Sequence, residues 1–293
     1  MCKKSIYLLC LLLVLSVPRQ VMAEIKVAEE LLVDLRAADL AYGSDTTTWV
    51  NRGTLDNFEA MGGAVVVEEV AGHKAVTFDG GSWFAGPTST PGIEGGGTRS
   101  IEVWAYNLDI DAHETMVSWG HRGGPGGSNM AFTYGNNPNY GAVGHWGVDM
   151  GWSPVPEAGN WWHLVYTYDG STSRLYVNAE ENATRDLTLV THGGGLIRVA
   201  AQAGNTGAEA ADQWTFSGSI GAVRIHDGVL SPSDVAHNFR VGLTDPALAS
   251  DPDPADGDTN VIRDVVLRWT PGESAPSIAG HKIYFGEDFN DVN

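Results

Sequence analysis

The sequence predicts an all-β fold with one short helix near its C-terminal end. Glycine and tryptophan are frequent, at 37 and 10 of 293 residues, and few segments repeat apolar residues at helical spacing. This composition is typical of chains made of many short strands and turns. A second observation is an aromatic-rich segment at 161–168 that runs into Asp169-Gly170 and returns at 174–178. Asp-Gly between two apolar runs is a β-hairpin signal.

Short apolar runs separated by turn residues predict eleven strands. They lie at residues 31–35, 64–70, 74–78, 99–106, 115–119, 129–134, 140–146, 161–168, 174–178, 196–202 and 219–226. In segment 99–106, the neighbours Val103 and Trp104 are both apolar although they point to opposite faces of a strand. Such a strand is typically central in its sheet. We expect its outer face to lie under other chain segments or to form a ligand-binding groove.

The one predicted helix starts at Ser231. A serine is a good N-cap, Pro232 suits the first helical position, and Asp234 favours the positive N-terminal end. Val235 and Phe239 are spaced to face the sheet together, and the helix is expected to end near residues 241–242.

The first 23 residues have the pattern of a secretory signal peptide. Lys3 and Lys4 precede an apolar run at 5–17, and a small-residue pattern at 21–23 ends just before Glu24. A membrane anchor is the alternative, but the run is too short to cross a bilayer comfortably. The sequence therefore predicts cleavage before Glu24 and a secreted or cell-surface protein without membrane insertion.

Charge and cysteine content exclude several functions. The formal net charge is −19, so clustered basic residues that would neutralise phosphates are lacking, and no nucleic-acid partner is expected. Both cysteines, Cys2 and Cys10, lie in the predicted signal peptide. The mature chain is therefore expected to hold no disulfide, thiol nucleophile or Cys-ligated zinc.

Four segments follow one another in an order that is characteristic of a known family. The hairpin reads GNWWHLVYTYDG at 159–170 and RLYVN at 174–178, and the other three read KAVTFDG at 74–80, RSIEVWAY at 99–106 and GSIGAVRIHDGVLS at 218–231. Together they resemble laminin-G-like, concanavalin A-like jelly-roll domains over about residues 30–243. The resemblance implies a two-sheet antiparallel jelly-roll sandwich, a scaffold that binds sugars. His163, inside the hairpin, is expected to be structural.

The chain divides into four parts in this prediction. After the signal peptide at 1–23, the jelly-roll domain spans 24–244, and a linker rich in Pro, Asp and Ala spans 245–260. Segments 264–272 and 281–286 resemble the first strands of a fibronectin type III-like module at 261–293. A complete sandwich of this kind needs about seven strands, so the tail is expected to be an incomplete β-sandwich.

The densest group of ligand-capable side chains lies between residues 116 and 152. Aromatic rings stack on the C–H faces of sugars, polar side chains hydrogen-bond the hydroxyls, and glycines keep the surrounding loops low. The predicted ligand-binding residues are His121, Arg122, Asn129, Tyr140, His145, Trp146, Asp149 and Trp152. The alternative is that tryptophans such as Trp119 and Trp146 belong to the core and that the glycines only form turns.

Segment 107–114 is the candidate for a catalytic site. Jelly-roll glucanases place a Glu, an Asp and a second Glu at alternating positions of one strand, one as nucleophile and another as acid. Here the first position is Asn107, and Glu114 falls off the alternation that Asp109 and Asp111 begin. We therefore predict no catalytic residue and interpret the segment as a solvated loop.

Calcium is the candidate cofactor. The resemblance implies a structural Ca²⁺ near the N-terminal strand, with ligands near Asp34 and Asp79. Against it, the closing strand has Ile220-Gly221-Ala222 where relatives commonly carry Ile-Asp-Glu, so one expected carboxylate is missing. No ligand is assigned.

Three functions remain open. The leading hypothesis is a secreted, non-catalytic recognition or adhesion module that binds extracellular carbohydrate, or a surface protein, in a groove of the jelly roll. The alternative is a glycoside hydrolase or lyase, or the accessory domain of a larger carbohydrate-active enzyme. The third is a purely architectural unit of a large surface protein.

Overall fold

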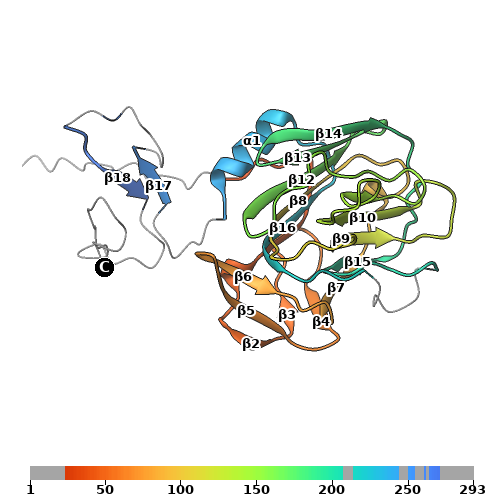
Figure 1. The fold of residues 1–293 in the computed structure, drawn as a ribbon, viewed down its shortest axis with the longest axis horizontal. Helices are drawn as coiled ribbons and strands as arrows, with labels where there is room; N and C mark the ends of the chain where they lie inside the picture. Colours follow the sequence, from red (N-terminus) through yellow and green to blue (C-terminus); the bar gives the residue numbers. More distant parts are fainter. Residues whose placement is uncertain (1–23, 207–213, 244–249, 255–260, 262–263, 271–293) are drawn as a thin grey trace, which may run out of the picture.

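The fold consists of two antiparallel β-sheets packed face to face, with one short helix on the outside (Figure 1). It is a computed structural model that describes residues 24–206, 214–243, 250–254, 261 and 264–270. The predicted signal peptide lies outside the described residues. The all-β sandwich with one short helix is confirmed.

The larger sheet has nine strands, in the order β14-β13-β12-β8-β16-β6-β5-β2, with β1 paired to β16. The strands are β1 (Leu31–Arg36), β2 (Gly43–Thr46), β5 (Val65–Val70), β6 (His73–Thr77), β8 (Arg99–Tyr106), β12 (Trp161–Tyr168), β13 (Thr172–Val177), β14 (Glu180–Asp186) and β16 (Ser219–His226). β8, β12 and β16 have the bounds that the sequence predicts. β8 lies between β12 and β16 and is buried on both faces, as its two-sided apolar pattern predicts.

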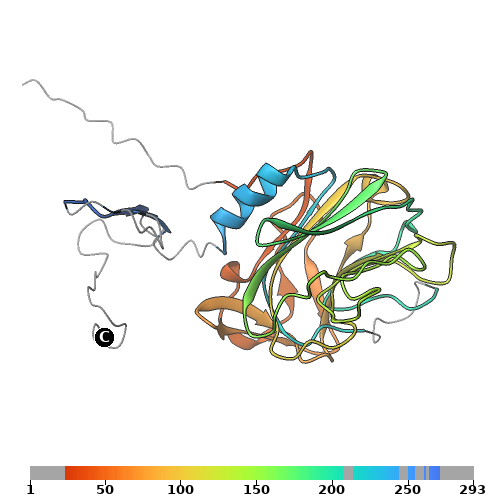
Figure 2. The ribbon, with the colours of Figure 1, turned by 45° about the horizontal axis from the view of Figure 1, so that its top comes forward.

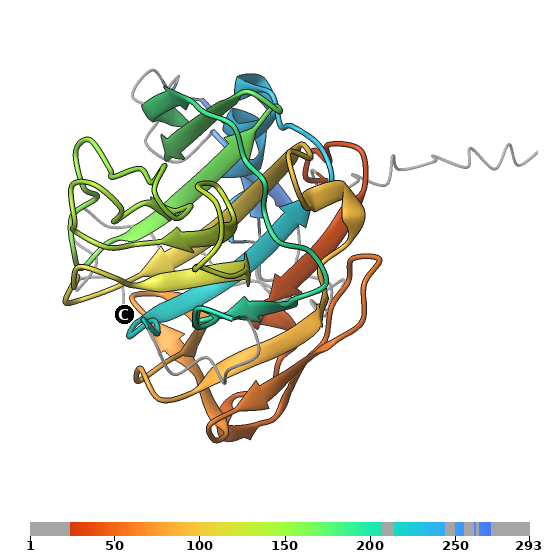
Figure 3. The same cartoon turned by 90° about the vertical axis from the view of Figure 1, so that its right-hand side faces the viewer.

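The second sheet has seven strands, in the order β11-β10-β9-β15-β7-β4-β3 (Figure 3). The strands are β3 (Thr48–Trp49), β4 (Phe58–Met61), β7 (Trp83–Thr88), β9 (Thr115–Gly120), β10 (Asn129–Thr133), β11 (Val143–Gly144) and β15 (Leu196–Val199), and two single-turn 3-10 helices, η1 (Ala37–Asp39) and η2 (Pro91–Ile93), lie in loops. The core fills the space between the sheets, with Val103 and Leu164 from one and Phe132 and Ile197 from the other.

Five strands of the two main sheets, β2, β3, β4, β7 and β14, are absent from the prediction, and the predicted strands at 140–146 and 196–202 are shorter than expected. The segment 140–146 is extended only at Val143–Gly144, because Trp146 and Gly147 have φ of 65° and 79°, which ends a strand. β7 is missing from the prediction because Gly86 and Pro87 interrupt its pattern. A Cβ at Gly86 would collide with the Phe58 ring on the neighbouring β4. Gly86 is therefore needed for close packing against Phe58, and it does not end the strand.

Helix α1 (Pro232–Val241) begins and ends where the sequence predicts. The Asp234 amide donates to Ser231 Oγ at 3.2 Å, and the Ser231 amide donates to the Asp234 carboxylate at 3.1 Å, which is a capping box. Phe239 stacks on Trp104 of β8 with ring centroids 5.9 Å apart. Val235 packs in a small separate cluster with Val165 of β12. Figure 2 shows α1 on the outside of the sandwich. The helix therefore covers the outer face of β8 and β12. In the described part of the chain, no helix has the length and apolar character needed to cross a membrane.

A buried polar cluster lies beneath α1. The Glu102 carboxylate accepts hydrogen bonds from Nε2 of His163 at 3.0 Å, Nε2 of His226 at 2.9 Å and Nδ2 of Asn238 at 3.0 Å. Burial alone would raise the pKa of Glu102, but the hydrogen bonds from the two histidines and the charge of Arg224 outweigh it and hold that pKa well below its usual range. His163 is thus buried in a structural network, as predicted.

Strands β17 (Ser250–Asp253) and β18 (Arg268–Thr270) pair with each other in a separate two-stranded sheet. β17 falls inside the segment 245–260 that is predicted to be a linker. The division of the chain into domain, linker and tail stays a prediction. β18 lies in the predicted strand segment 264–272, whereas segment 281–286 lies outside the described residues. The fibronectin type III-like tail stays a prediction.

Candidate functional site

A cavity of about 200 Å³ opens on the outer face of the seven-stranded sheet, beside β10. Met130 and Phe132 of β10 point into the core. Because side chains alternate along a strand, Asn129 and Thr133 point outward and form part of the cavity lining. The full lining consists of His113, Arg122, Asn129, Thr133, Tyr140, Gly144, Trp146, Asp149, Gln202 and Trp214.

Stacked rings from three separate segments form one wall of this cavity. The His113 ring lies between Tyr140, at a centroid distance of 4.3 Å, and Trp214, at 4.6 Å. The Arg122 guanidinium lies over the Trp214 ring, 3.2 Å from its centroid. Burial lowers the pKa of His113, the charge of Arg122 lowers it further, and Asp149 opposes both. His113 is therefore neutral near pH 7, and the wall carries its positive charge on Arg122.

Trp146 presents an exposed ring at the cavity. Its side chain is 39% exposed, and its Nε1–H donates to the Gly124 carbonyl at 3.0 Å. Its φ of 65° is an unusual backbone conformation for a bulky residue. The Asp149 carboxylate holds this turn by accepting the amides of His145 at 2.6 Å and Gly147 at 3.3 Å. An indole held by its backbone and its ring nitrogen is a preformed platform for an apolar ligand face.

Asn129 adds a polar group to the cavity wall. Its Nδ2 donates to the Gly144 carbonyl at 2.7 Å. Its Oδ1 is buried and accepts no hydrogen bond from the residues that the structure describes. A buried acceptor without a donor costs free energy, so a hydroxyl group brought by a ligand or water would be stabilised there. Nearby, the Gln202 amide donates to Thr115 Oγ1 at 3.4 Å.

Five of the eight predicted ligand-binding residues line this cavity: Arg122, Asn129, Tyr140, Trp146 and Asp149. His121 is not among the lining residues, and its ring stacks on His192 with centroids 3.9 Å apart. Trp119, for which a core position was the alternative, is fully buried.

The structure contradicts a ligand-facing position for His145 and Trp152. His145 is fully buried between the sheets, where its Nε2 pairs with the hydroxyl of Tyr166, and burial lowers its pKa to about 3. Trp152 is 5% exposed and packs on Phe132, with its Nε1–H donating to the Thr133 carbonyl at 3.2 Å. Both side chains belong to the core because the loop that carries them folds back over β10 and β11.

Sequence reasoning missed His113, Thr133, Gln202 and Trp214. His113 lies within segment 107–114, and Trp214 directly follows residues 207–213, which are outside the described residues. The only sequence signal for His113 and Trp214 is a ring side chain in a polar segment. That signal is too weak to place either ring at a common site without the fold.

Segment 107–114 is solvated only in part. Asp109 and Asp111 are exposed, whereas Asn107 and Glu114 are buried. The Glu114 carboxylate accepts the Ser217 amide at 2.8 Å and its hydroxyl at 2.9 Å, and burial raises the pKa of Glu114. It thereby anchors the chain that follows Trp214. Among the described lining residues of the cavity, Asp149 is the one carboxylate, whereas glycoside hydrolysis ordinarily uses a facing pair.

The carboxylates near which calcium was expected, Asp34 and Asp79, accept hydrogen bonds from other groups of the protein. Asp34 is 2% exposed and accepts hydrogen bonds from Arg36 Nη2 at 2.6 Å and Arg224 Nε at 3.3 Å. Two guanidinium groups beside one carboxylate do not fit a cation ligand, so the Asp34 carboxylate itself is not suited to bind calcium. A structural calcium ion stays a prediction. Asp79 accepts the amides of Gly81 and Ser82. The described residues contain no group of three or more His, Cys, Asp or Glu side chains arranged to hold a metal ion.

The fold and a sequence comparison agree on the family. The family described as the concanavalin A-like lectin/glucanases superfamily matches residues 87–236, and the chain belongs to this family. The predicted resemblance to a concanavalin A-like jelly-roll domain is thereby confirmed. A comparison with curated protein sequences finds no match.

Several solved structures are similar to this chain at low identity. Domain 4 of AbnA, a GH43 extracellular arabinanase from Geobacillus stearothermophilus, solved with arabinotriose, is 17% identical with a TM-score of 0.51, over 72% of this chain and 98% of that domain. Trypanosoma rangeli sialidase, solved with sialic acid, is 13% identical with a TM-score of 0.47, over 72% of this chain and 32% of that chain. The binding domain of Paraclostridial Mosquitocidal Protein 1 is 13% identical with a TM-score of 0.48, over 75% of this chain and 54% of that chain. The first of these supports the jelly-roll fold.

Proposed function

We propose that this chain is a secreted, non-catalytic module that binds carbohydrate in the cavity between Trp146 and the stacked wall of His113, Tyr140 and Trp214. The observation that carries the proposal is the exposed Trp146 ring, held in place at a concave site that also contains polar side chains. The arabinanase domain with which it shares its fold was solved with an oligosaccharide. That likeness supports carbohydrate as the ligand class.

The cavity chemistry favours a neutral sugar. The C–H face of a pyranose or furanose ring stacks on Trp146, and a sugar hydroxyl donates to Asn129 Oδ1. Of the charged lining residues, Arg122 is positive and Asp149 is negative, so the site offers little net charge to an ionic ligand. Affinity is therefore expected to depend weakly on salt.

The size of the site favours a terminal sugar or a short branch. Its volume of about 200 Å³ is below the several hundred Å³ typical of sites that enclose larger ligands. The rest of a glycan would extend over the surface beyond Trp146. Binding by a single sugar unit is typically weak, so avidity through repeated contacts would raise the affinity for a polysaccharide.

The proposal is tested with the mature chain on an array of neutral and acidic glycans, followed by titration of each bound glycan and an assay for released reducing ends. Saturable binding of neutral glycans without release supports it. Release of reducing ends would instead support the glycoside hydrolase alternative. Binding only to protein partners, with no glycan bound, would overturn the carbohydrate assignment.

A further inference from the structure

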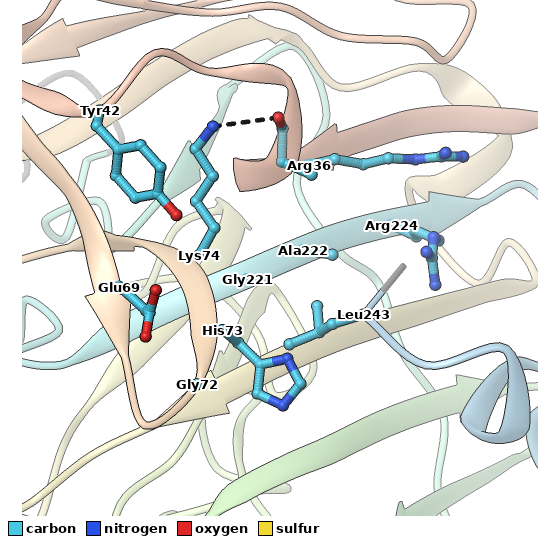
Figure 4. Close-up of a pocket in the computed structure, with 11 residues that line it drawn as sticks. Arg36, Tyr42, Glu69, Gly72, His73, Lys74, Gly221, Ala222, Arg224 and Leu243 are labelled. Atoms are coloured by element: carbon cyan, nitrogen blue, oxygen red, sulfur yellow. Dashed lines mark hydrogen bonds between the residues drawn. The ribbon is translucent and has the colours of Figure 1, made fainter. Parts of the chain in front are cut away.

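We infer a second binding site, for the carboxylate group of a small or sugar ligand, on the other sheet of the sandwich. Its position is a pocket of about 110 Å³ between β1, β6, β16 and Leu243, which lies two residues past the end of α1 (Figure 4). The lining residues that matter are Arg36, Tyr42, Lys74, Arg224 and Leu243. The site is independent of the proposed carbohydrate cavity, which lies on the seven-stranded sheet.

Positive charge gathers in this pocket although the whole chain is acidic. Three cationic side chains, Arg36, Lys74 and Arg224, line it, against one lining carboxylate, Glu69. A formal net charge of −19 over the chain makes such a cluster a local feature rather than a consequence of composition. Asp34 offsets part of it through its ion pairs with the two arginines.

Arg224 supplies a buried donor that the protein leaves without an acceptor. Its side chain is 3% exposed, and its Nε donates to Asp34 at 3.3 Å. Its Nη1 is buried and has no hydrogen-bond partner among the described residues. An unpaired N–H on a buried guanidinium is costly. A ligand oxygen that enters the pocket would offset this cost with a charge-assisted hydrogen bond.

The pocket is open because small residues form its floor. Gly72, Gly221 and Ala222 line it without long side chains. A Cβ at Gly221 would lie 2.6 Å from Leu243 Cδ2, so glycine is needed where Leu243 packs over β16. Figure 4 shows Leu243 and Arg224 on the same side of the pocket, with Lys74 and Tyr42 opposite.

Lys74 supplies a second donor at the pocket mouth. Its Nζ lies 4.5 Å from the centroid of the Tyr42 ring and donates to the Ala38 carbonyl at 3.4 Å. An ammonium group has three N–H donors, so others remain for a ligand. The Tyr42 ring is 59% exposed and offers an apolar face beside the charge, as the ring of a sugar acid requires.

The surrounding charges favour a monoanion over a dianion. Glu69 in the lining and Asp34 behind Arg224 repel a second negative charge. Partial burial lowers the pKa of His73, although Glu69 opposes this, so His73 adds no positive charge near pH 7. A carboxylate carries a single negative charge, so it meets less of this repulsion than a phosphate dianion does.

The test is NMR titration of the ¹⁵N-labelled mature chain with four probes: sodium acetate, sodium glucuronate, glucose and inorganic phosphate. We expect saturable shifts of the Gly72, Gly221 and Ala222 amides with a carboxylate and none with glucose. Tighter binding of glucuronate than of acetate would identify an acidic sugar as the ligand. Equal binding of the two probes would identify a carboxylate without a sugar ring as the ligand. Tighter binding of phosphate, or saturable shifts with glucose, would overturn the assignment.

A matched pair of lysine variants makes the test specific. Lys74→Gln is expected to weaken carboxylate binding about tenfold, because one charge-assisted hydrogen bond is lost. Lys26→Gln removes an equal charge from an exposed residue outside the pocket and is expected to leave binding unchanged. Absence of saturable shifts with both carboxylates, or equal behaviour of the two variants, would show that the pocket is not a carboxylate site.

Discussion

The Arg122 guanidinium lies over the indole of Trp214, with Cζ 3.2 Å from the ring centroid. Arg122 follows β9, whereas Trp214 precedes β16, so the contact joins two loops that are far apart in sequence. A cation over an aromatic face is stabilised by about 0.5–2 kcal/mol, more when it is shielded from water. The Arg122–Trp214 pair, together with His113 and Tyr140, forms a wall that is assembled before any ligand binds. Because these side chains are already ordered, binding costs less conformational entropy.

Trp146→Ala is expected to weaken glycan binding at least tenfold and to change the free energy of unfolding by less than about 1 kcal/mol, because the ring is exposed at the cavity. Trp162→Ala, which removes a half-buried ring outside the cavity, serves as the control and should leave binding unchanged. Titration calorimetry and denaturant unfolding measure the two quantities. Equal binding by both variants would place the ligand elsewhere.

Trp152→Ala is expected to destabilise the fold by about 3–5 kcal/mol, since a large buried side chain is removed from the core. Any loss of binding should then follow the loss of folded protein. Urea unfolding of the variant beside the parent chain measures the difference. A change below about 1 kcal/mol would mean that Trp152 does not pack as the structure shows.

Acid is expected to destabilise the domain through His145. Burial lowers its pKa to about 3 in the folded state, against about 6.5 in the unfolded chain. The unfolded state therefore binds the proton first, and stability falls as pH drops below about 6.5. Between pH 7.5 and 5.5 this one residue accounts for a loss of about 1.4 kcal/mol.

Unfolding of His145→Gln and of the parent chain at the two pH values checks this expectation. The variant should be less stable at pH 7.5 but should lose less stability on going to pH 5.5. His237→Gln, a half-buried residue whose ring contacts the Glu24 carbonyl, is the control. The assignment fails if His145→Gln and the parent chain show the same pH dependence.

Glu102→Gln is expected to cost about 3 kcal/mol or more of unfolding free energy, because it removes the charge that accepts hydrogen bonds from His163, His226 and Asn238. The loss should loosen α1, which Asn238 ties to β8. Glu68→Gln, at an exposed position of β5, should stay within about 0.5 kcal/mol of the parent chain. Similar stabilities for the two variants would argue against the network.

The exported protein is expected to begin at Glu24, since the small-residue pattern at 21–23 follows an apolar run of signal-peptide length. Intact-mass and N-terminal mass spectrometry of the secreted chain test this. A mature protein that retains Cys10 would contradict it and would reopen the question of a membrane anchor.

Removal of residues 249–293 is expected to change the melting temperature by less than about 5 °C. In the described part of the chain, β17 and β18 pair only with each other and not with a strand of either main sheet. Their unpaired edges favour association, so the shortened chain should also aggregate less. A larger drop on thermal unfolding would show that the tail completes the core of the jelly roll.

Local pattern was sufficient for the elements whose residues repeat at a clear period. β8, β12 and β16 were predicted to the residue because they are long and apolar, and α1 because its capping box is a contiguous signal. The polar edge strand β14 was not predicted. Its residues are mostly exposed, so they carry no alternation of buried and exposed positions that the sequence could show.

The sequence by itself determined the all-β class, the central strands, the capped helix and the segment 116–152, which contributes seven of the ten lining residues of the cavity. Only the tertiary structure decided which rings of that segment are exposed. Trp146 and Trp152 are the same residue type six positions apart, yet one lies at the cavity and the other in the core. The backbone turn at Trp146 keeps its ring exposed at the cavity, whereas the packing of Trp152 on Phe132 buries its ring in the core. Such contacts join residues from different strands and loops, and composition and periodicity report only on neighbours along the chain.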